Sequence, residues 1–149
     1  MRTDTCRSGE NNGLVSFVKK HAGQKPFNAG LITVALGGAA LSSFVQAHSF
    51  YTAQNIDVLE PKSSMQLDVK LFYCLCIEAN TFRYSTFGRE ANRTLKNLLV
   101  PIIDCVPEWV DGICAKAAEE LGRDLRAAIE RVSPRIVTFL GLTKGDALV

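Results

Sequence analysis

Two β-prone runs separated by paired glycines constrain the fold of this chain more than any other feature. The runs cover residues 31–36 and 41–45, with Gly37 and Gly38 between them. Glycine tolerates the positive φ that tight hairpin turns need, so the pattern predicts an antiparallel hairpin. A third run, residues 55–59, is β-branched and apolar, and Pro61 ends it. We expect these runs to form strands of one sheet.

The connection over residues 46–55 is rich in amide and aromatic side chains and poor in charge. Such groups suit hydrogen bonding to base edges of DNA better than simple attraction to phosphates. The candidate DNA-contacting residues in this segment are Gln46, His48, Tyr51 and Gln54. His48 has a second interpretation as an ordinary surface residue.

A second hairpin is predicted upstream, from residues 1–8 and 14–19. The sequence GENNG between them contains Asn and Gly, which accept left-handed backbone geometry and so favour a turn. A basic loop follows, with Lys19, Lys20 and Lys25. This loop either grips the DNA backbone or is simply solvated, and the sequence leaves both interpretations open.

A central helix is predicted after residues 63–64, because a serine before an apolar run is an N-cap signal. Apolar residues occupy nearly all sides of residues 67–78, so we expect this helix to be buried against the sheet. The predicted fold class is therefore α+β. A twisted, mostly antiparallel or mixed sheet would pack on the central helix, and an amphipathic helix would follow at the C-terminus.

Residues 81–96 are the second informative segment, since they concentrate four basic side chains against Glu90 alone. Arginine offers a planar donor fork that suits phosphate or guanine, and asparagine can serve adenine. The candidates here are Arg83, Arg89, Asn92, Arg93 and Lys96. The alternative is that Arg89 and Glu90 brace the loop against the core.

The C-terminal part predicts an edge strand and then a helix. Pro101 limits residues 98–103 to an edge or a strand end. Pro107 suits a helix start, and Pro134 would end that helix. Its apolar side would comprise Val110, Ile113, Cys114, Ala117, Leu121, Leu125, Ala128, Ile129 and Val132. We expect a globular domain over 1–106, the helix over 107–133 and a tail over 134–149.

Composition narrows the class of protein. The chain has 149 residues, 47% of them hydrophobic and 21% charged, which suits one domain with a real core. The formal charge of +2 is only weak support for a nucleic-acid partner. No long apolar stretch and no leader-like N-terminus is present, so we expect a cytoplasmic protein. Five scattered cysteines favour structural thiols over disulfides or a zinc site.

Several segments together resemble the target recognition domain of DNA-specificity subunits in type I restriction–modification systems and their type IIB relatives. The segments are ITVALGGAALSSFVQ, FYTAQNIDVLEPK and KLFYCLCIEANTFRYSTFGREANRTLKNLLVP. The resemblance runs from about Thr3 to about Trp109 and implies a bacterial defence function. It implies double-stranded DNA and a methyltransferase subunit as partners. The helix of this chain ends sooner than in the family, so a half-subunit that forms a homodimer, a fragment and a remnant all stay open.

The resemblance implies no catalysis by the chain itself, and no cofactor is expected. The segment holding Asp57, Glu60 and Lys62 imitates the metal site of restriction nucleases. That site needs an acid from a neighbouring strand, and no Asp or Glu lies between Glu10 and Asp57. The main hypothesis is a DNA-reading specificity domain that recognises a short half-site. The alternatives are a degenerate domain that binds only proteins and, third, a small magnesium-dependent nuclease.

Overall fold

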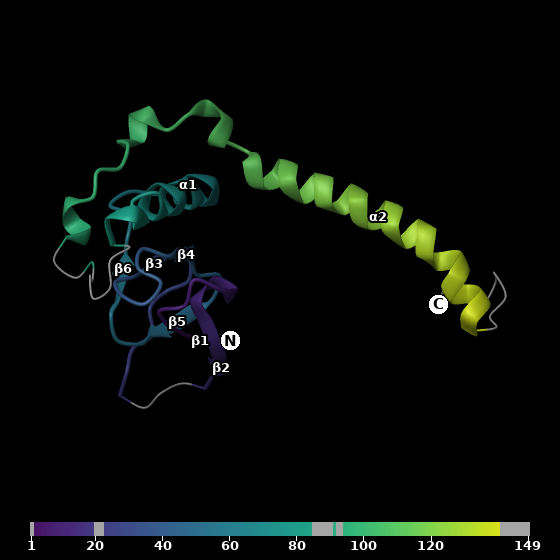
Figure 1. The fold of residues 1–149 in the computed structure, drawn as a ribbon, viewed down its shortest axis with the longest axis horizontal. Coiled ribbons are helices and arrows are strands. Elements are labelled where there is room, and N and C mark those ends of the chain that lie inside the picture. Colours follow the sequence, from purple (N-terminus) through teal and green to yellow (C-terminus); the bar gives the residue numbers. More distant parts are fainter. Residues whose placement is uncertain (1, 20–22, 85–90, 92–93, 141–149) are drawn as a thin grey trace. The chain divides into compact units, whose positions relative to one another are not determined.

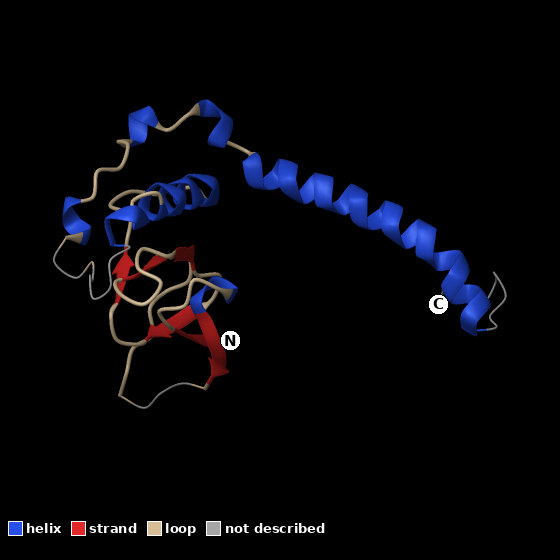
Figure 2. Cartoon of the chain, viewed as in Figure 1, coloured by secondary structure: helices blue, strands red, loops and turns tan. Residues whose placement is uncertain are grey.

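The computed structural model describes residues 2–19, 23–84, 91 and 94–140, and it confirms the α+β class (Figure 1, Figure 2). The strands in this part of the chain are β1 (Arg2–Thr5), β2 (Leu14–Val18), β3 (Ile32–Ala35), β4 (Ser43–Val45), β5 (Ser49–Thr52) and β6 (Ile56–Leu59). The α-helices are α1 (Leu67–Glu78) and α2 (Ile113–Leu140). The chain divides into two units, Met1–Asp111 and Gly112–Val149.

The six strands form two sheets, whereas the sequence predicts one. The first sheet has the order β2-β1-β5, with β1 antiparallel to β2 and parallel to β5. The turn between β1 and β2 has the predicted left-handed geometry, with φ of 51°, 56° and 66° at Asn11, Asn12 and Gly13. The second sheet has the order β4-β3-β6 and is antiparallel throughout.

The predicted hairpin around the paired glycines is confirmed. β3 and β4 pair antiparallel, with Ile32 opposite Val45. Gly38 has φ of +73°, and a Cβ at this position would lie 3.3 Å from the carbonyl oxygen of Arg7. Glycine is thus needed here for both its backbone angle and its small size.

The core lies between the second sheet and α1, with β3 buried along its whole length. Ile32, Val34 and Leu36 pack there with Cys74 and Ile77 of α1. The prediction that α1 packs on the sheet is confirmed, although the leucines at 67, 71 and 75 on its other side are exposed. The predicted serine N-cap is wrong, since Gln66 occupies that position without a side-chain cap bond.

Two predictions about local structure need correction. Residues 46–55 are not a simple connection, because they contain β5, which pairs with the distant β1. Residues 98–103 form no strand. Short 3₁₀ turns at Leu95–Asn97 and Ile103–Cys105 flank them instead, and Pro101 between these turns lacks the N–H that a strand ladder would use.

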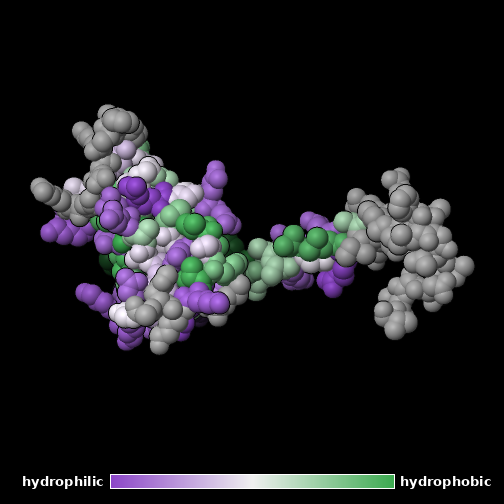
Figure 3. All heavy atoms as spheres, turned by 90° about the horizontal axis from the view of Figure 1, so that it is seen from below, coloured by the Kyte–Doolittle hydropathy of each residue, from purple (hydrophilic) through white to green (hydrophobic). Residues whose placement is uncertain are grey.

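The second unit consists, in its described part, of α2. The helix begins six residues after Pro107. Gly112, with φ of +72°, interrupts the helical backbone conformation between a 3₁₀ turn (Glu108–Val110) and α2. It continues through Pro134 to Leu140, so the prediction that Pro107 starts it and Pro134 ends it is wrong. A proline removes one hydrogen bond of a helix without necessarily ending it. Ile113, Leu121 and Leu125 are exposed, and Figure 3 shows hydrophobic side chains of this helix between hydrophilic ones.

All five cysteines lie in the described residues and carry thiols rather than disulfides. Within the part of the chain that is described, no helix is long and apolar enough to cross a membrane.

Candidate nucleic-acid interface

Exposed polar residues gather around the first sheet. The register places Arg2 of β1 opposite both Val18 of β2 and Ser49 of β5. Lys19 follows Val18 directly and His48 precedes Ser49, so both side chains lie at this end of the sheet, and both are exposed. The end of the first sheet therefore presents a lysine and an imidazole to solvent.

The segment over residues 23–30 attaches to the outer edge of β5. The amide of Phe27 donates to the carbonyl oxygen of Phe50 at 2.8 Å, and the amide of Phe50 donates back at 3.1 Å. The two rings also stack, with centroids 5.4 Å apart. This pairing fixes the backbone two residues after Lys25, whose side chain is exposed.

Gln54 follows the other end of β5. The amide of Ala53 donates to the carbonyl oxygen of Thr5 at 3.1 Å, which holds this turn against β1, and Gln54 is exposed. We call the exposed residues attached to β2 and β5, namely Lys19, Lys25, His48 and Gln54, the first-sheet surface.

The segment that joins β2 to β5 carries basic but no acidic residues. Residues 11–56 contain no Asp or Glu, and Asp4 is the only acidic residue in the sequences of β1, β2 and β5. By contrast, β6 carries Asp57, and Glu60 follows it. A surface with basic and few acidic groups attracts a polyanion.

Gln46 and Tyr51 do not belong to this surface, although the sequence predicts them as DNA contacts. Gln46 is 1% exposed, and its side-chain amide donates to Thr33 Oγ1 at 2.9 Å and to the carbonyl oxygen of Asn12 at 3.1 Å. Tyr51 lies within β5 and is buried. Their side chains are enclosed by the fold, so neither lies on the first-sheet surface.

Arg83 and Lys96 are exposed but belong to segments that follow α1. Arg83 lies in a 3₁₀ turn (Thr81–Tyr84), and its guanidinium carbon is 5.6 Å from the centre of the Phe82 ring. Lys96 lies at the margin of an apolar pocket. The predicted contacts Lys20, Arg89, Asn92 and Arg93 lie outside the described residues.

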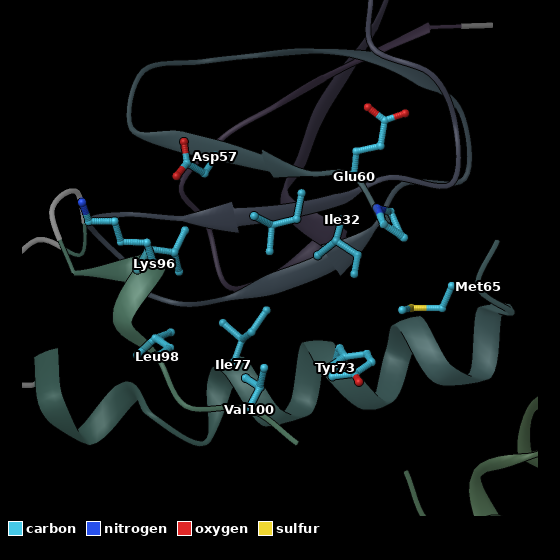
Figure 4. Close-up of a pocket in the computed structure, with 12 residues that line it drawn as sticks. Ile32, Asp57, Glu60, Met65, Tyr73, Ile77, Lys96, Leu98 and Val100 are labelled. Carbon is cyan, nitrogen blue, oxygen red and sulfur yellow. The ribbon is translucent and has the colours of Figure 1, made fainter. Parts of the chain in front are cut away.

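The pocket beside Lys96 has a volume of about 360 Å³ and lies between β6, α1 and residues 95–100 (Figure 4). Most of its lining is apolar, including Ile32, Ile77 and Leu98. Figure 4 shows the carboxylates of Asp57 and Glu60 apart from each other along its rim. In the described residues no group of three His, Cys, Asp or Glu side chains could hold a metal ion. The nuclease interpretation therefore gains no support from the placement of these acids.

Sequence reasoning missed two features of the first sheet, the exposure of Phe17 and the pairing of β1 with β5. Phe17 was assigned to a strand, but the pattern did not predict that its side chain is 56% exposed. The pairing of β1 with β5, on which the arrangement depends, joins segments more than 40 residues apart and leaves no local signal.

Comparison with known proteins identifies the family. No curated protein and no solved structure matches the chain. The family described as type I restriction modification DNA specificity domain matches residues 3–104, which is more than half of the chain and includes both sheets and α1. The resemblance seen in the sequence is thereby confirmed. The chain belongs to this family and is a DNA sequence-specificity domain of a restriction–modification system.

Proposed function

We propose that the first-sheet surface reads a short DNA half-site. The observation that carries this proposal is the absence of acidic residues over positions 11–56, combined with the exposure of Lys19, Lys25, His48 and Gln54. Lysines would fix the position of the chain on the phosphate backbone. The imidazole and the amide carry donors and acceptors that can distinguish base edges in the major groove.

The segments after α1 form a second set of proposed contacts. Arg83 and Lys96 are exposed there, and Arg89, Asn92 and Arg93 are close to them in sequence. Lys20 extends the first set in the same way. These residues would add phosphate contacts or base contacts beyond the first-sheet surface.

The chain itself would not be catalytic. As a specificity domain, it would bind DNA in the cytoplasm and direct separate methyltransferase and nuclease subunits to the site. The exposed apolar side of α2, which includes Leu121 and Leu125, would bind the methyltransferase subunit or α2 of a second copy. A homodimer formed in this way would read a site in two parts.

The test is DNA selection by the purified full chain. The protein would retain duplexes from a random library at two salt concentrations, and the retained duplexes would be sequenced. We expect one short motif, with weaker retention at high salt because phosphate contacts release counterions. Retention without any common motif, with and without the methyltransferase subunit of the same system, would contradict the proposal.

A matched pair of variants separates the first-sheet surface from the rest. Lys19 and Lys62 are both exposed, but Lys62 follows β6 of the second sheet. We expect Lys19→Ala to weaken retention of all duplexes, and Lys62→Ala to leave it nearly unchanged. Equal effects of the two substitutions would show that the first-sheet surface has no special role.

The second candidate function is a protein-interaction module that no longer binds DNA. The exposed leucines of α2 favour it, since such a side usually has a partner. Complex formation with the methyltransferase subunit that is insensitive to salt, without DNA retention by the complex, would support this alternative. Loss of that complex in Leu121→Glu with DNA selection unchanged would instead support two separate surfaces.

A further inference from the structure

An exposed aromatic ring lies beside Lys19 and His48 of the first-sheet surface. Phe17 belongs to β2, an edge strand, and the register places it opposite Thr3 of β1, which in turn pairs with Phe50 of β5. Residues opposite one another in a sheet point to the same side. Thr3 and Phe50 are fully buried on that side, yet Phe17 is 56% exposed. The ring therefore lies at the margin of the buried side and extends into solvent.

The ring of Phe17 is held by His48. Their centroids are 6.4 Å apart, with an angle of 62° between the planes, which is an edge-to-face contact. His48 is the residue before β5, and β1 lies between β2 and β5, so the contact reaches across β1. Phe17 and His48 together form an exposed patch of one apolar and one polar ring, which we call the Phe17 patch.

The charge around the Phe17 patch indicates which partner it fits. Lys19 lies two residues from Phe17, and no acidic residue occurs between positions 11 and 56. An apolar patch with a lysine beside it and no nearby acid complements a partner surface in which anionic groups surround an apolar group. The major groove of DNA has this character, because phosphates border it and thymine places a methyl group in it. Within the first sheet, Phe17 lies on the edge strand β2, the side of the sheet from which a groove could be approached.

We propose that Phe17 contacts the methyl group of a thymine in the major groove, with His48 holding the ring in place. Phe17 is then a specificity-determining residue that favours T·A at one position of the recognised site. This inference rests on the proposed DNA-reading function of the first-sheet surface. It adds an apolar contact to the polar contacts proposed there.

The experiment removes the methyl group from the DNA rather than from the protein. In the selected duplex, each thymidine would be replaced singly by deoxyuridine, which differs from thymidine only in the missing methyl group. Affinities for the full chain would be measured by fluorescence anisotropy. We expect one position at which the replacement weakens binding about fourfold, the factor equivalent to the ~0.8 kcal/mol gained on burying one such group.

Variants assign that effect to Phe17. In Phe17→Ala, the thymine and deoxyuridine duplexes should bind equally at that position. Phe17→Leu should keep most of the difference, because leucine retains an apolar contact. Leu75→Ala is the matched control, since Leu75 is 63% exposed and lies on α1, away from the first sheet. It should keep the full difference. Circular dichroism would establish that each variant is folded.

The outcomes separate this inference from the function on which it rests. A selected motif with no T·A pair, or a selective chain that binds all deoxyuridine duplexes as well as the parent, would overturn the thymine contact alone. A difference that persists in Phe17→Ala would also overturn it. Absence of any sequence-selective binding, with or without the methyltransferase subunit, would overturn both the thymine contact and the proposed function.

Discussion

Replacing Gln46 tests whether its side chain belongs to the fold or to the DNA interface. The sequence favours an interface role, whereas the structure buries Gln46 at 1% exposure. Its amide nitrogen donates to Thr33 Oγ1 at 2.9 Å and to the carbonyl oxygen of Asn12 at 3.1 Å. These bonds tie β3 and the turn before β2 to the residue that follows β4. We therefore expect Gln46→Ala to destabilise the first unit and to leave the recognised DNA motif unchanged.

The magnitude follows from the lost contacts. Two hydrogen bonds at about 1 kcal/mol each contribute ~2 kcal/mol, and loss of one buried methylene adds ~0.8 kcal/mol. Thr33 Oγ1 still donates to the carbonyl oxygen of Phe44, so it keeps one partner. The expected loss in free energy of unfolding is thus about 3 kcal/mol. Gln54→Ala is the control, because Gln54 is exposed, and it should change that free energy by less than about 0.5 kcal/mol.

Urea unfolding followed by tryptophan fluorescence measures this change in the free energy of unfolding of the first unit. Trp109 is the single tryptophan, and its ring lies 6.2 Å from that of Phe72 in α1, so its emission reports on the first unit. With a urea dependence of about 2 kcal/mol per molar, the midpoint should fall by ~1.5 M. A Gln46→Ala protein as stable as the parent but selecting a different DNA motif would refute the structural role of Gln46.

Three further predictions use other parts of the chain. Lys19→Ala and Lys25→Ala should each reduce the slope of log affinity against log salt by ~0.9, equally for all duplex sequences, as measured by anisotropy titrations. Gly38→Ala should destabilise the folded first unit by about 1–2 kcal/mol, because φ is +73° and a Cβ would lie 3.3 Å from a backbone oxygen. Gly122→Ala should stabilise α2 by ~1 kcal/mol. Urea unfolding followed by circular dichroism measures both changes. Burial, with a smaller contribution from a nearby carboxylate, raises the pKa of Cys74 to about 12, so iodoacetamide should label it only after unfolding. The contribution of the Cys74 thiol to the free energy of unfolding is full below the ordinary thiol pKa of about 8.5. It is lost as pH rises through about 12.

Local features of the fold could be predicted from the sequence because their causes are local. The glycines at 37 and 38 predict the β3–β4 hairpin, and Gly38 indeed has positive φ. The Asn-Asn-Gly turn between β1 and β2 depends likewise on residues that accept left-handed geometry. Family membership could be recognised because the matched segments cover both sheets and α1.

Features that depend on distant contacts could not be predicted. β5 exists because β1 pairs with it in parallel, and nothing in residues 46–55 shows that partner. Gln46 is buried because Asn12 and Thr33 accept its hydrogen bonds, and these residues lie 34 and 13 positions away. An amide in a polar segment looks the same in sequence whether it faces solvent or the core, so exposure decides its role.

The most direct test of the DNA-reading surface is an NMR titration of the isotope-labelled chain with the selected duplex. We predict that amide shifts change first at β2 (Leu14–Val18), Lys19 and His48, while those of α1 (Leu67–Glu78) stay constant. A scrambled duplex should produce smaller changes, confined to the residues beside lysines. Shift changes centred on α1, with β2 and His48 unaffected, would contradict the assignment of DNA reading to the first-sheet surface.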